Sequence, residues 1–539
     1  MRLIIKEYLL QLKEKDELDL LLCDLLLQMG YQTDNIPKTG NRQYGVDIQA
    51  HKTNNLILCV VKQGNIDRNV WNNGQNSVRQ SLEEIFDSYL PTLTESEKCK
   101  KISIVVTTNG VLDESVKRNW SGYVDNHKNW RDKSIEISFW GIDDITAKIQ
   151  QYLFSEHLFP QQIQGYLRKA LYFVEEPDYK NYYFEQIIDS YIIQISELIK
   201  EESSSSRIRR QFRKDVASLF MATQMIAQYA SNVKRYKIGV MVSEYLLIRY
   251  WKFLLDKGLM EKQVYCEWLV KFYQAYRKWA SKYYEEVKEY CETKDAFPTY
   301  SNIVEQKLML YEVIGFLVSY GYFETENDID RAQQIVATIV TLFNNCPQVW
   351  YAPYDCNIVQ IVMLYKLLIR CGRKNEVSIL LQNQTTLLEQ YYCSFRKYPT
   401  SADTFRDAIA IELEEEREDY DSSGMWGYFL LWIAILDERE LYAEIQPFLS
   451  EELSEVTKCV WFIRGDEETY LYDNYVTRLA GDGVAIDVLK DYDEFKERVD
   501  FILNQYKSEI FSYDELSFPS IEIIACRYFN YVPRVTTSE

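Results

Sequence analysis

The chain has 539 residues, of which 47% are hydrophobic and 26% are charged, and its formal net charge is −20. This balance is typical of a folded globular protein and argues against disorder as the main state. No apolar run approaches the roughly 18 residues that a membrane span needs, and the first residues are too charged for a secretory signal, so we expect a cytoplasmic protein without membrane contact.

The placement of charge and of cysteine argues against two kinds of site. Residues 1–160 hold 19 Lys and Arg against 22 Asp and Glu, whereas the rest of the chain holds 42 against 59. An acidic surface repels phosphate, so a nucleic-acid contact of the later residues would have to come from local basic patches. The 11 cysteines form no CxxC pair and the three histidines show no ligand spacing with them, which favours reduced thiols over a zinc site.

The first 160 residues change hydrophobic period repeatedly, as expected of an α/β domain. A leucine-rich amphipathic helix ends at Gly30, and a turn at residues 54–55 joins the next two strands as a hairpin. The predicted order is helix, strand, strand, helix, strand, strand, helix, which indicates a mixed sheet with helices on its faces. The patterns place helices over residues 18–29, 77–89 and 143–153, and strands over residues 44–50, 56–62, 102–108 and 135–140.

After Pro160 the strand pattern nearly vanishes and helical spacing dominates. We find no regular repeat period, so the expected architecture is a large all-α region built as an irregular helical repeat or bundle array. Its many tyrosines are typical of core packing. The predicted domains are residues 1–160, a nuclease-like α/β domain on the grounds given below, residues 161–420, a helical region, and residues 421–539, a C-terminal helical region.

Three residues near the start of the chain suit metal-assisted chemistry on a phosphodiester. Asp47 lies in the first strand, Lys62 ends the second, and Asp19 lies on the preceding helix. A hairpin brings positions 47 and 62 near one another, and a helix packed on it can supply Asp19. Carboxylates can hold Mg²⁺ with water left on the ion, and a lysine can orient that water or stabilise the pentavalent phosphate. Taken singly, Asp19 could be an ordinary solvated carboxylate, and Lys62 ends a strand so apolar that its ammonium group needs a partner.

Residues 1–160 resemble the PD-(D/E)xK nuclease superfamily, in particular Mrr-type restriction endonucleases and archaeal Holliday-junction resolvases. Asp19 matches the acid of the first helix, and Lys62 matches the terminal lysine of the Glu/Gln-x-Lys motif. Gly45-Val46-Asp47 matches the Gly-x-Asp motif, and Met29-Gly30-Tyr31 is similar to the family's helix end. The resemblance implies a restriction-endonuclease-like fold, Asp19 and Asp47 as ligands of Mg²⁺ (or Mn²⁺), and Lys62 as the catalytic lysine.

One position departs from the family motif, because its Glu or Gln falls on Val60. Strand alternation places Val60 on the same face as Lys62, and a valine side chain binds no metal. In one interpretation the two aspartates suffice with water and the substrate phosphate, and Gln63 or Asp67 compensates. In the other, the domain has lost activity and keeps only its fold and a DNA contact.

Two further segments are candidates for contact with a DNA backbone. Gln75 and Arg79 lie near the start of the helix predicted over residues 77–89, and Arg79 is the better suited to a phosphate. Arg209 and Arg210 belong to the densest basic run of the helical region. The alternative for the first segment is a capped surface helix. For the second it is a solvated face or a docking site for an acidic partner.

These features indicate a Mg²⁺-dependent DNA endonuclease fused to a helical region that senses a trigger, recruits a partner or drives homo-oligomerisation. By resemblance, such fusions serve bacterial anti-phage defence or restriction. The chain has no GxxxxGK[ST] loop, so an ATPase, if one takes part, is a separate protein. The alternative is a non-enzymatic scaffold that binds DNA or protein through a degenerate nuclease fold, and an RNA substrate stays open.

Overall fold

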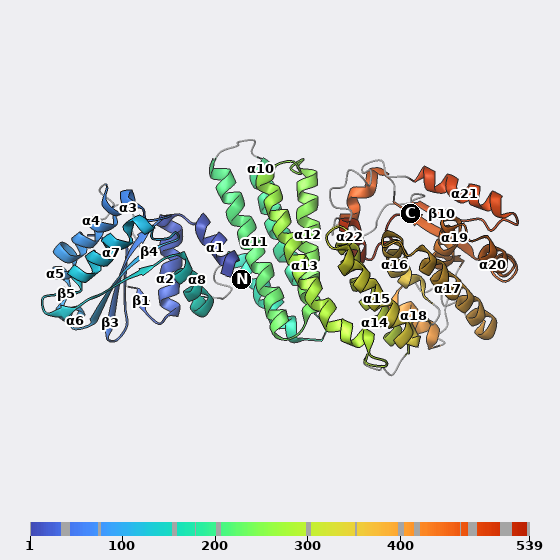
Figure 1. The fold of residues 1–539 in the computed structure, drawn as a ribbon, viewed down its shortest axis with the longest axis horizontal. Coiled ribbons are helices and arrows are strands. Elements are labelled where there is room, and N and C mark those ends of the chain that lie inside the picture. Colours follow the sequence, from blue (N-terminus) through green and yellow to red (C-terminus); the bar gives the residue numbers. More distant parts are fainter. Residues whose placement is uncertain are drawn as a thin grey trace. The chain divides into compact units, whose positions relative to one another are not determined.

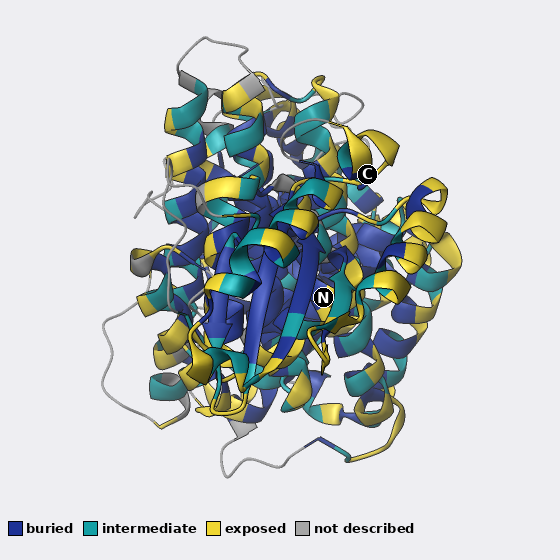
Figure 2. Cartoon of the chain, turned by 90° about the vertical axis from the view of Figure 1, so that its left-hand side faces the viewer, coloured by how far each residue is buried: buried dark blue, intermediate teal, exposed yellow. Residues whose placement is uncertain are grey.

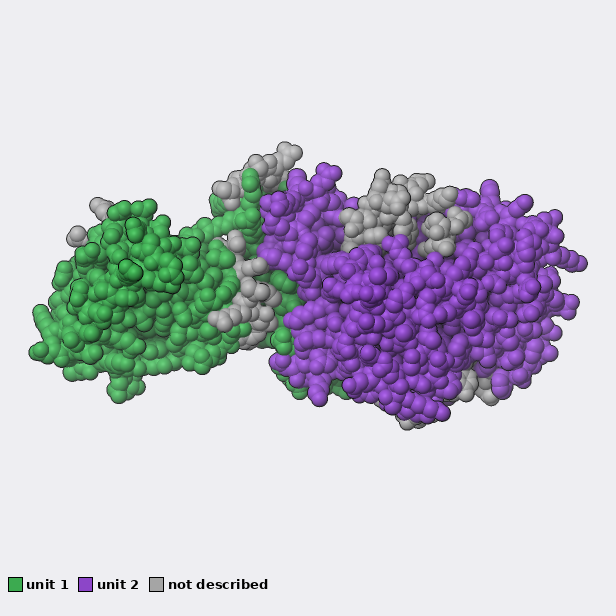
Figure 3. Space-filling model, viewed as in Figure 1, with its two compact units in different colours: residues 1–229 green, residues 230–539 purple. Residues whose placement is uncertain are grey.

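The chain folds into two compact units, residues 1–229 (unit 1) and residues 230–539 (unit 2) (Figure 3). The domain boundary predicted at residue 160 falls inside unit 1, and the one at residue 420 falls inside unit 2. The computed structural model describes residues 2–33, 44–73, 77–153, 159–177, 179–200, 206–297, 303–350, 353–396, 404–413, 421–463, 465–472, 482–506 and 520–535.

A five-stranded mixed sheet with the order β1-β2-β3-β4-β7 forms the centre of the α/β part of unit 1 (Figure 1). Its strands are β1 (Gln32–Thr33), β2 (Ile48–His51), β3 (Asn55–Lys62), β4 (Lys101–Thr108) and β7 (Glu136–Trp140), and a separate hairpin pairs β5 (Asn129–Trp130) with β6 (Lys133–Ser134). The hairpin of β2 and β3 is antiparallel with Ile48 opposite Cys59, whereas β3, β4 and β7 run parallel. β3 is apolar and buried along nearly its whole length, as expected of a strand covered on both faces.

Different helices cover the two faces of this sheet (Figure 1). They are α2 (Asp19–Gln28) and α8 (Ile142–Lys148) on one side, and α4 (Val78–Glu84) and α7 (Glu114–His127) on the other. Val60 of β3 shares a hydrophobic core with Leu82 of α4 and Val116 of α7. Cys59 belongs to the opposite face, where it lies near Cys23 of α2. Figure 2 shows the strands of the sheet as buried, with helices of mixed exposure in front of them.

Two details of the sheet differ from the sequence-based expectation. The strand predicted over residues 44–50 begins only at Ile48, because Tyr44 and Gly45 have positive φ angles of 44° and 80° that turn the chain. A Cβ at Gly45 would lie 2.1 Å from the carbonyl oxygen of Ser81, so α4 approaches this turn too closely for any other residue. The pattern also misses α7, in which Val116 and Tyr123 are the buried residues, too few to give a clear helical period.

The remaining helical segments of unit 1 precede, connect and follow the sheet strands. They include a π-helical turn, η1 (Glu14–Leu18), directly before α2. Long helices follow the sheet, in agreement with the prediction for residues beyond 160. The segments are α1 (Arg2–Gln11), α3 (Arg68–Asn72), η2 (Ile85–Tyr89), α5 (Leu90–Thr92), α6 (Glu95–Lys98), η3 (Ile149–Leu153), α9 (Gln161–Tyr172), η5 (Phe173–Glu175), α10 (Tyr182–Lys200) and α11 (Ser206–Asn232).

Asp215 of α11 is a buried carboxyl group whose hydrogen bonding is incomplete. Its Oδ1 accepts a hydrogen bond from Gln211 Nε2 at 2.8 Å, whereas Oδ2 has no hydrogen-bond partner among the described residues. Burial raises the pKa of Asp215 to about 6, above that of an unfolded aspartate, so its favourable contribution is present at low pH and is lost as pH rises through 6. We expect Asp215→Asn to raise the free energy of unfolding by about 2 kcal/mol at pH 8 and to change it little at pH 4. Urea titrations at the two pH values measure this, and equal effects would contradict it.

Unit 2 is mainly helical, but it contains a small sheet that corrects the expectation of an all-α region after residue 160. β9 (Thr457–Phe462) lies between β8 (Ser422–Ser423) and β10 (Asp482–Ala485), parallel to the first and antiparallel to the second. Burial alternates along β9, as in a strand with one covered face. The segment is only six residues long, so its alternation of apolar and polar residues is a weak sequence signal beside the long helices. A Cβ at Gly427 would lie 2.3 Å from Cys459 O, so the helix that begins at Gly424 packs directly on β9.

The helices of unit 2 differ widely in length. None of its described helices, nor of those in unit 1, combines the length and the apolar composition that crossing a bilayer requires. The helices are α12 (Tyr236–Asp256), α13 (Gln263–Glu292), α14 (Ile303–Glu324), α15 (Ile329–Asn345), α16 (Ile358–Arg370), α17 (Lys374–Phe395), α18 (Phe405–Glu412), α19 (Gly424–Leu436), α20 (Arg439–Glu451), α21 (Tyr492–Gln505) and α22 (Ser520–Phe529), with 3₁₀ turns at η6 (Pro347–Trp350), η7 (Asp355–Asn357) and η9 (Gly465–Tyr472).

Candidate functional site

The carboxyl ends of the parallel strands β3 and β4 meet at one edge of the sheet, where Lys62 lies beside Thr108. Ligand sites of α/β folds commonly lie at this edge, because the loops that leave the strands converge there. Hydrogen bonds join the loops that follow β3 and β4. Thr108 Oγ1 donates to Gly64 O at 2.5 Å, and Asn109 Oδ1 accepts from Gly64 N at 2.8 Å. The segment after Lys62 is therefore held against the segment after Thr108.

Asn109 also connects α1 to this edge of the sheet. Its Nδ2 donates to Leu9 O at 2.8 Å and to Leu12 O at 2.9 Å, and its side chain is buried. Asn109→Ala leaves these carbonyls and the Gly64 amide without their partner, so we expect the free energy of unfolding to fall by about 2–3 kcal/mol in urea denaturation. Asn73→Ala, which removes one exposed side-chain hydrogen bond, is the control with an expected change below about 0.5 kcal/mol. Equal losses in the two variants would contradict the anchoring role.

Asp47 lies where the chain enters β2, and its carboxylate continues the hydrogen bonding of the hairpin. Its Oδ2 accepts from Val61 N at 2.7 Å, and its own N–H donates to Cys59 O at 2.9 Å. Burial raises the pKa of Asp47, while the Val61 hydrogen bond and the positive charge of Lys62 act in the opposite direction. The structure thus brings Asp47 and Lys62 together at the carboxyl edge of β3.

Lys62 is buried at the end of an apolar strand, with only 8% of its surface exposed. Burying an ammonium group costs free energy unless a negative charge lies close, and Asp47 supplies such a charge. Within the described ranges no hydrogen bond joins Lys62 Nζ to another residue. An ammonium group has three hydrogen-bond donors, which suit water or a bound anion.

Asp19 begins α2 and is 4% exposed. Its Oδ1 accepts from the next backbone N–H at 2.8 Å, so this hydrogen bond stays within its own helix. Burial, with a smaller effect from the charge of Asp19, raises the pKa of the Cys23 thiol to about 11. Burial, with smaller effects from Cys23 and Asp47, also raises the pKa of the Cys59 thiol. Asp19 and Asp47 thus each act on one of these two thiols, and no described interaction joins Asp19 to Asp47 or to Lys62.

Val60, at the position of the motif's missing Glu or Gln, is fully buried in the core beneath α4 and α7. A carboxylate there would lie in apolar surroundings and would cost folding free energy. Of the two residues considered as substitutes, Gln63 is exposed directly after Lys62. Asp67 instead caps α3, since its Oδ1 accepts from Asn69 N and Val70 N at 2.9 Å each.

Glu14 and Lys15 are residues of this edge that the sequence reasoning missed. They begin the π-helical turn η1, and both act on Asp47, with Glu14 raising its pKa and Lys15 lowering it. Because η2 and η3 are also π-helical turns, the type of turn does not by itself mark a site. The signal in the sequence was the charged run over residues 13–17 directly before the leucine-rich helix.

The basic run of α11 packs against this same turn. Glu17 of η1 accepts hydrogen bonds from Lys214 Nζ at 3.2 Å and from Lys13 N at 2.8 Å. Burial raises the pKa of Glu17, but the Lys13 amide and the charges of Lys214 and Arg210 outweigh it and lower the pKa. Arg210, predicted as a DNA contact, is therefore engaged with η1, whereas Arg209 of the same prediction is exposed.

The other predicted DNA contacts lie on the α4 side of the sheet. Arg79 forms an exposed ion pair with Glu83 at 2.9 Å, as expected of a solvated helix surface, and Ser77 caps α4. Gln75 lies outside the described residues. Contact of Arg79 with a phosphate stays a prediction.

The carboxylates of this edge suit only one kind of metal site. Among the described residues there is no group of three or more His, Cys, Asp and Glu that could hold a metal ion. Asp19 and Asp47 each have one carboxylate oxygen outside the hydrogen bonds above. Mg²⁺ is commonly held by one or two carboxylates, with water and substrate phosphate completing its shell. Carboxylates of this number suit an ion that is shared with a substrate phosphate better than an ion held by protein alone.

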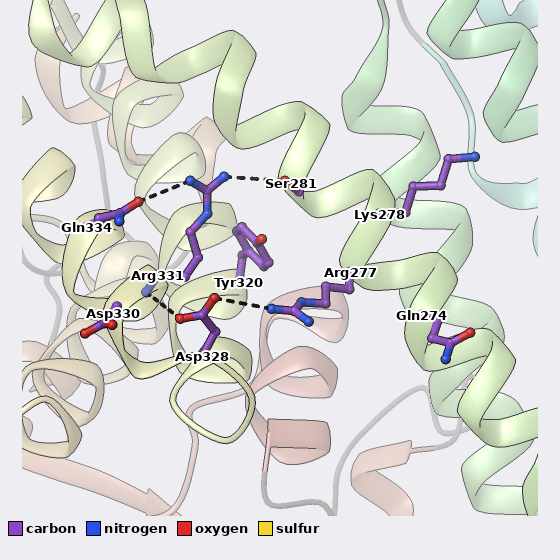
Figure 4. A pocket seen from close by; sticks show the side chains of 9 residues that line it. All are labelled: Gln274, Arg277, Lys278, Ser281, Tyr320, Asp328, Asp330, Arg331 and Gln334. Atoms are coloured by element: carbon purple, nitrogen blue, oxygen red, sulfur yellow. Dashed lines mark hydrogen bonds and ion pairs between the residues drawn. The ribbon is translucent and has the colours of Figure 1, made fainter.

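Unit 2 has an open groove of about 760 Å³ between α13 and the start of α15 (Figure 4). Its two arginines are already paired: Arg277 donates to the buried Glu324 at 2.8 and 2.9 Å, and Arg331 binds Glu285. The backbone N–H of Arg331 also donates to Asp328 Oδ1 at 3.1 Å. Because these carboxylates neutralise the guanidinium groups, we interpret the network as a connection between α13 and α15 and not as an anion site.

No family model, no curated protein and no solved structure matches this chain.

Proposed function

We propose that unit 1 is a Mg²⁺- or Mn²⁺-dependent DNA endonuclease with a restriction-endonuclease-like fold. The main support is the buried Lys62 beside Asp47 at the carboxyl edge of a mixed sheet, with Asp19 on the adjacent helix. The Lys62 side chain is mostly buried near a carboxylate, at the edge where the loops after the parallel strands converge. Ligand sites of α/β folds commonly lie at this edge.

In this proposal each residue acts on a phosphodiester held at the edge. Asp47 and Asp19 would hold the ion through the carboxylate oxygens left outside their backbone hydrogen bonds. When bound, Mg²⁺ supplies a water of lowered pKa and neutralises phosphate charge. Lys62 donates to the phosphate oxygen on which negative charge develops, and the cross-linked loops keep Lys62 in place for that role.

The helical parts would then control the nuclease, by binding a trigger, a separate ATPase or other protein partner, or a second copy of the chain. The contact of Glu17 with Lys214 supports a role for α11, because it joins this helix to the turn that carries Glu14. By the resemblance stated above, we extend the proposal to bacterial anti-phage defence or restriction. DNA is the proposed substrate, and RNA is the substrate to be compared with it.

A second candidate function is a non-enzymatic scaffold that binds DNA or protein. The observation that favours it is the burial of Val60 in the core, which leaves two carboxylates where the motif has three acidic or amide groups. A scaffold would keep the fold and its surfaces without hydrolysing a phosphodiester.

Cleavage of supercoiled plasmid DNA by the full chain tests the two candidates. The nuclease proposal expects nicked or linear product with Mg²⁺ or Mn²⁺ and none with excess EDTA. A parallel reaction with a structured RNA determines which nucleic acid is cut. The absence of cleavage with every metal, substrate and partner tried would favour the scaffold.

A further inference from the structure

A hollow of about 390 Å³ lies at the same edge of the unit 1 sheet as Lys62. It is lined by Trp120 of α7, Phe139 of β7 and Leu112 of the loop after β4, among others. The rings of Trp120 and Phe139 meet edge to face, with centroids 5.8 Å apart. Both rings are only partly buried, so aromatic surface stays open to solvent within the hollow.

Backbone hydrogen bonds join this hollow to the loop that follows Lys62. Ile66 N donates to Val111 O at 2.9 Å, and Asp113 N donates to Ile66 O at 3.1 Å. Val111 is itself part of the lining. Ile66 lies four positions after Lys62, and four residues span at most about 14 Å. A strand with a phosphate at Lys62 would therefore have a neighbouring base within reach of the hollow.

The polar groups of the hollow include hydrogen-bond acceptors. Asp143 and Asp144 both line it, as does Lys117, whose charge is paired with Glu114. Asp143 pairs with Lys6 at 2.5 Å while half of its side chain stays exposed, and Asp144 Oδ2 accepts from Gly141 N at 3.1 Å. An ionised carboxylate only accepts hydrogen bonds. Cytosine, adenine and guanine present an amino donor, whereas thymine presents carbonyl oxygen in its place.

We propose that this hollow binds one unstacked nucleobase with an exocyclic amino group, supplied by a nucleic-acid strand held at the candidate site. The placement of that strand at Lys62 rests on the proposed function. The chemistry of the hollow follows from its lining residues alone. Because the two rings meet at 70°, a base stacks on one of them with its edge against the other, which favours any base, and the carboxylates add the preference for an amino group. Single-stranded or distorted DNA binds more tightly than intact duplex, because a paired base must first leave its stack.

Binding measured without cleavage tests this inference. The probe is a single-stranded oligonucleotide carrying 2-aminopurine, whose fluorescence changes on stacking, added to the unmodified full chain in excess EDTA so that the proposed cleavage cannot occur. Oligo(dC) is expected to compete better than oligo(dT) of equal length. Trp120→Leu and Ser121→Trp, which fills the hollow from an exposed position, are each expected to weaken binding by about 5- to 100-fold. Asp143→Asn is expected to remove the preference for dC.

The control is Asn119→Trp, an exposed position of α7 that does not line the hollow, with expected binding like the parent. Equal binding by the parent, Ser121→Trp and Trp120→Leu, or equal competition by oligo(dC) and oligo(dT), would overturn the inference. Displacement of the probe by dCMP at concentrations as low as by oligo(dC) would assign the hollow to free nucleotides and not to a strand. Base binding without plasmid cleavage would contradict only the nuclease proposal. Plasmid cleavage without base binding would contradict only the proposal that the hollow binds a base.

Discussion

Lys62→Ala is expected to lower the rate of metal-dependent DNA cleavage by at least about 100-fold. The reason is that Lys62 lies near Asp47 at this edge, where its ammonium group would neutralise the charge that develops on a phosphate. Removing one positioned donor of this kind commonly costs two to three orders of magnitude in rate, as a rough guide. The measurement is the initial rate of plasmid nicking at saturating Mg²⁺.

Lys101→Ala is the matched control for this prediction. Lys101 begins β4 at the opposite edge of the sheet and forms an exposed ion pair with Glu136, so its loss is expected to leave the rate within about twofold. Asp47→Asn is expected to raise the Mg²⁺ concentration needed for half-maximal cleavage. Cleavage that persists unchanged in both Lys62→Ala and Asp47→Asn would disprove the site assignment.

Arg527→Met is expected to lower the free energy of unfolding of unit 2 by about 3–5 kcal/mol. Arg527 of α22 donates through Nε to Glu244 of α12 at 2.8 Å and makes a second contact through Nη2, and Glu244 is 0% exposed. The guanidinium group also lies 4.0 Å from the ring centre of Phe316. Removing Arg527 leaves a carboxylate in the core without its counter-charge. Urea denaturation followed by hydrogen exchange of α22 measures the loss.

The pH dependence of this loss gives a second check. Burial raises the pKa of Glu244 to about 7, and the charge of Arg527 works against that rise. Without Arg527 the pKa rises further, so the folded state holds the neutral acid at low pH and must bury a charge as pH increases. The destabilisation by Arg527→Met is therefore expected to be larger at pH 8 than at pH 5.

Two variants separate the buried charge from lost packing. Glu244→Leu combined with Arg527→Met removes both charges and is expected to recover most of the stability. Arg439→Met breaks the exposed pair with Asp493 and is expected to cost less than about 1 kcal/mol. If Arg527→Met costs no more than Arg439→Met, the buried pair does not hold α22 in place.

Much of the fold of unit 1 could be predicted from short segments. The strands β3 and β4 are continuous apolar runs, and a turn at residues 54–55 joins β2 to β3, so local periodicity was enough to place them. The pattern failed where apolar residues were few. It missed α7, and it missed β9, whose six residues lie among long helices.

Part of the candidate site could be predicted from the sequence, and part could not. The spacing of Asp47 and Lys62 on a hairpin predicted that they lie near one another, and the electrostatic effect of Lys62 on Asp47 agrees. The π-helical turn that carries Glu14, and its contact with Lys214 some two hundred residues later, could not be read from the spacing. Cleavage of a phosphodiester by these groups stays a proposal.

The sequence by itself determined the mixed sheet, the largely helical remainder and the placement of Asp47 and Lys62 on neighbouring strands, because each depends on a residue and its near neighbours. The tertiary structure alone decided that Val60 faces the core, that Glu17 meets Lys214, and that the hollow beside Trp120 opens at the same edge as Lys62. The physical reason is that burial and charge pairing depend on which distant segments pack together. Hydrophobic periodicity does not indicate which distant segments pack together.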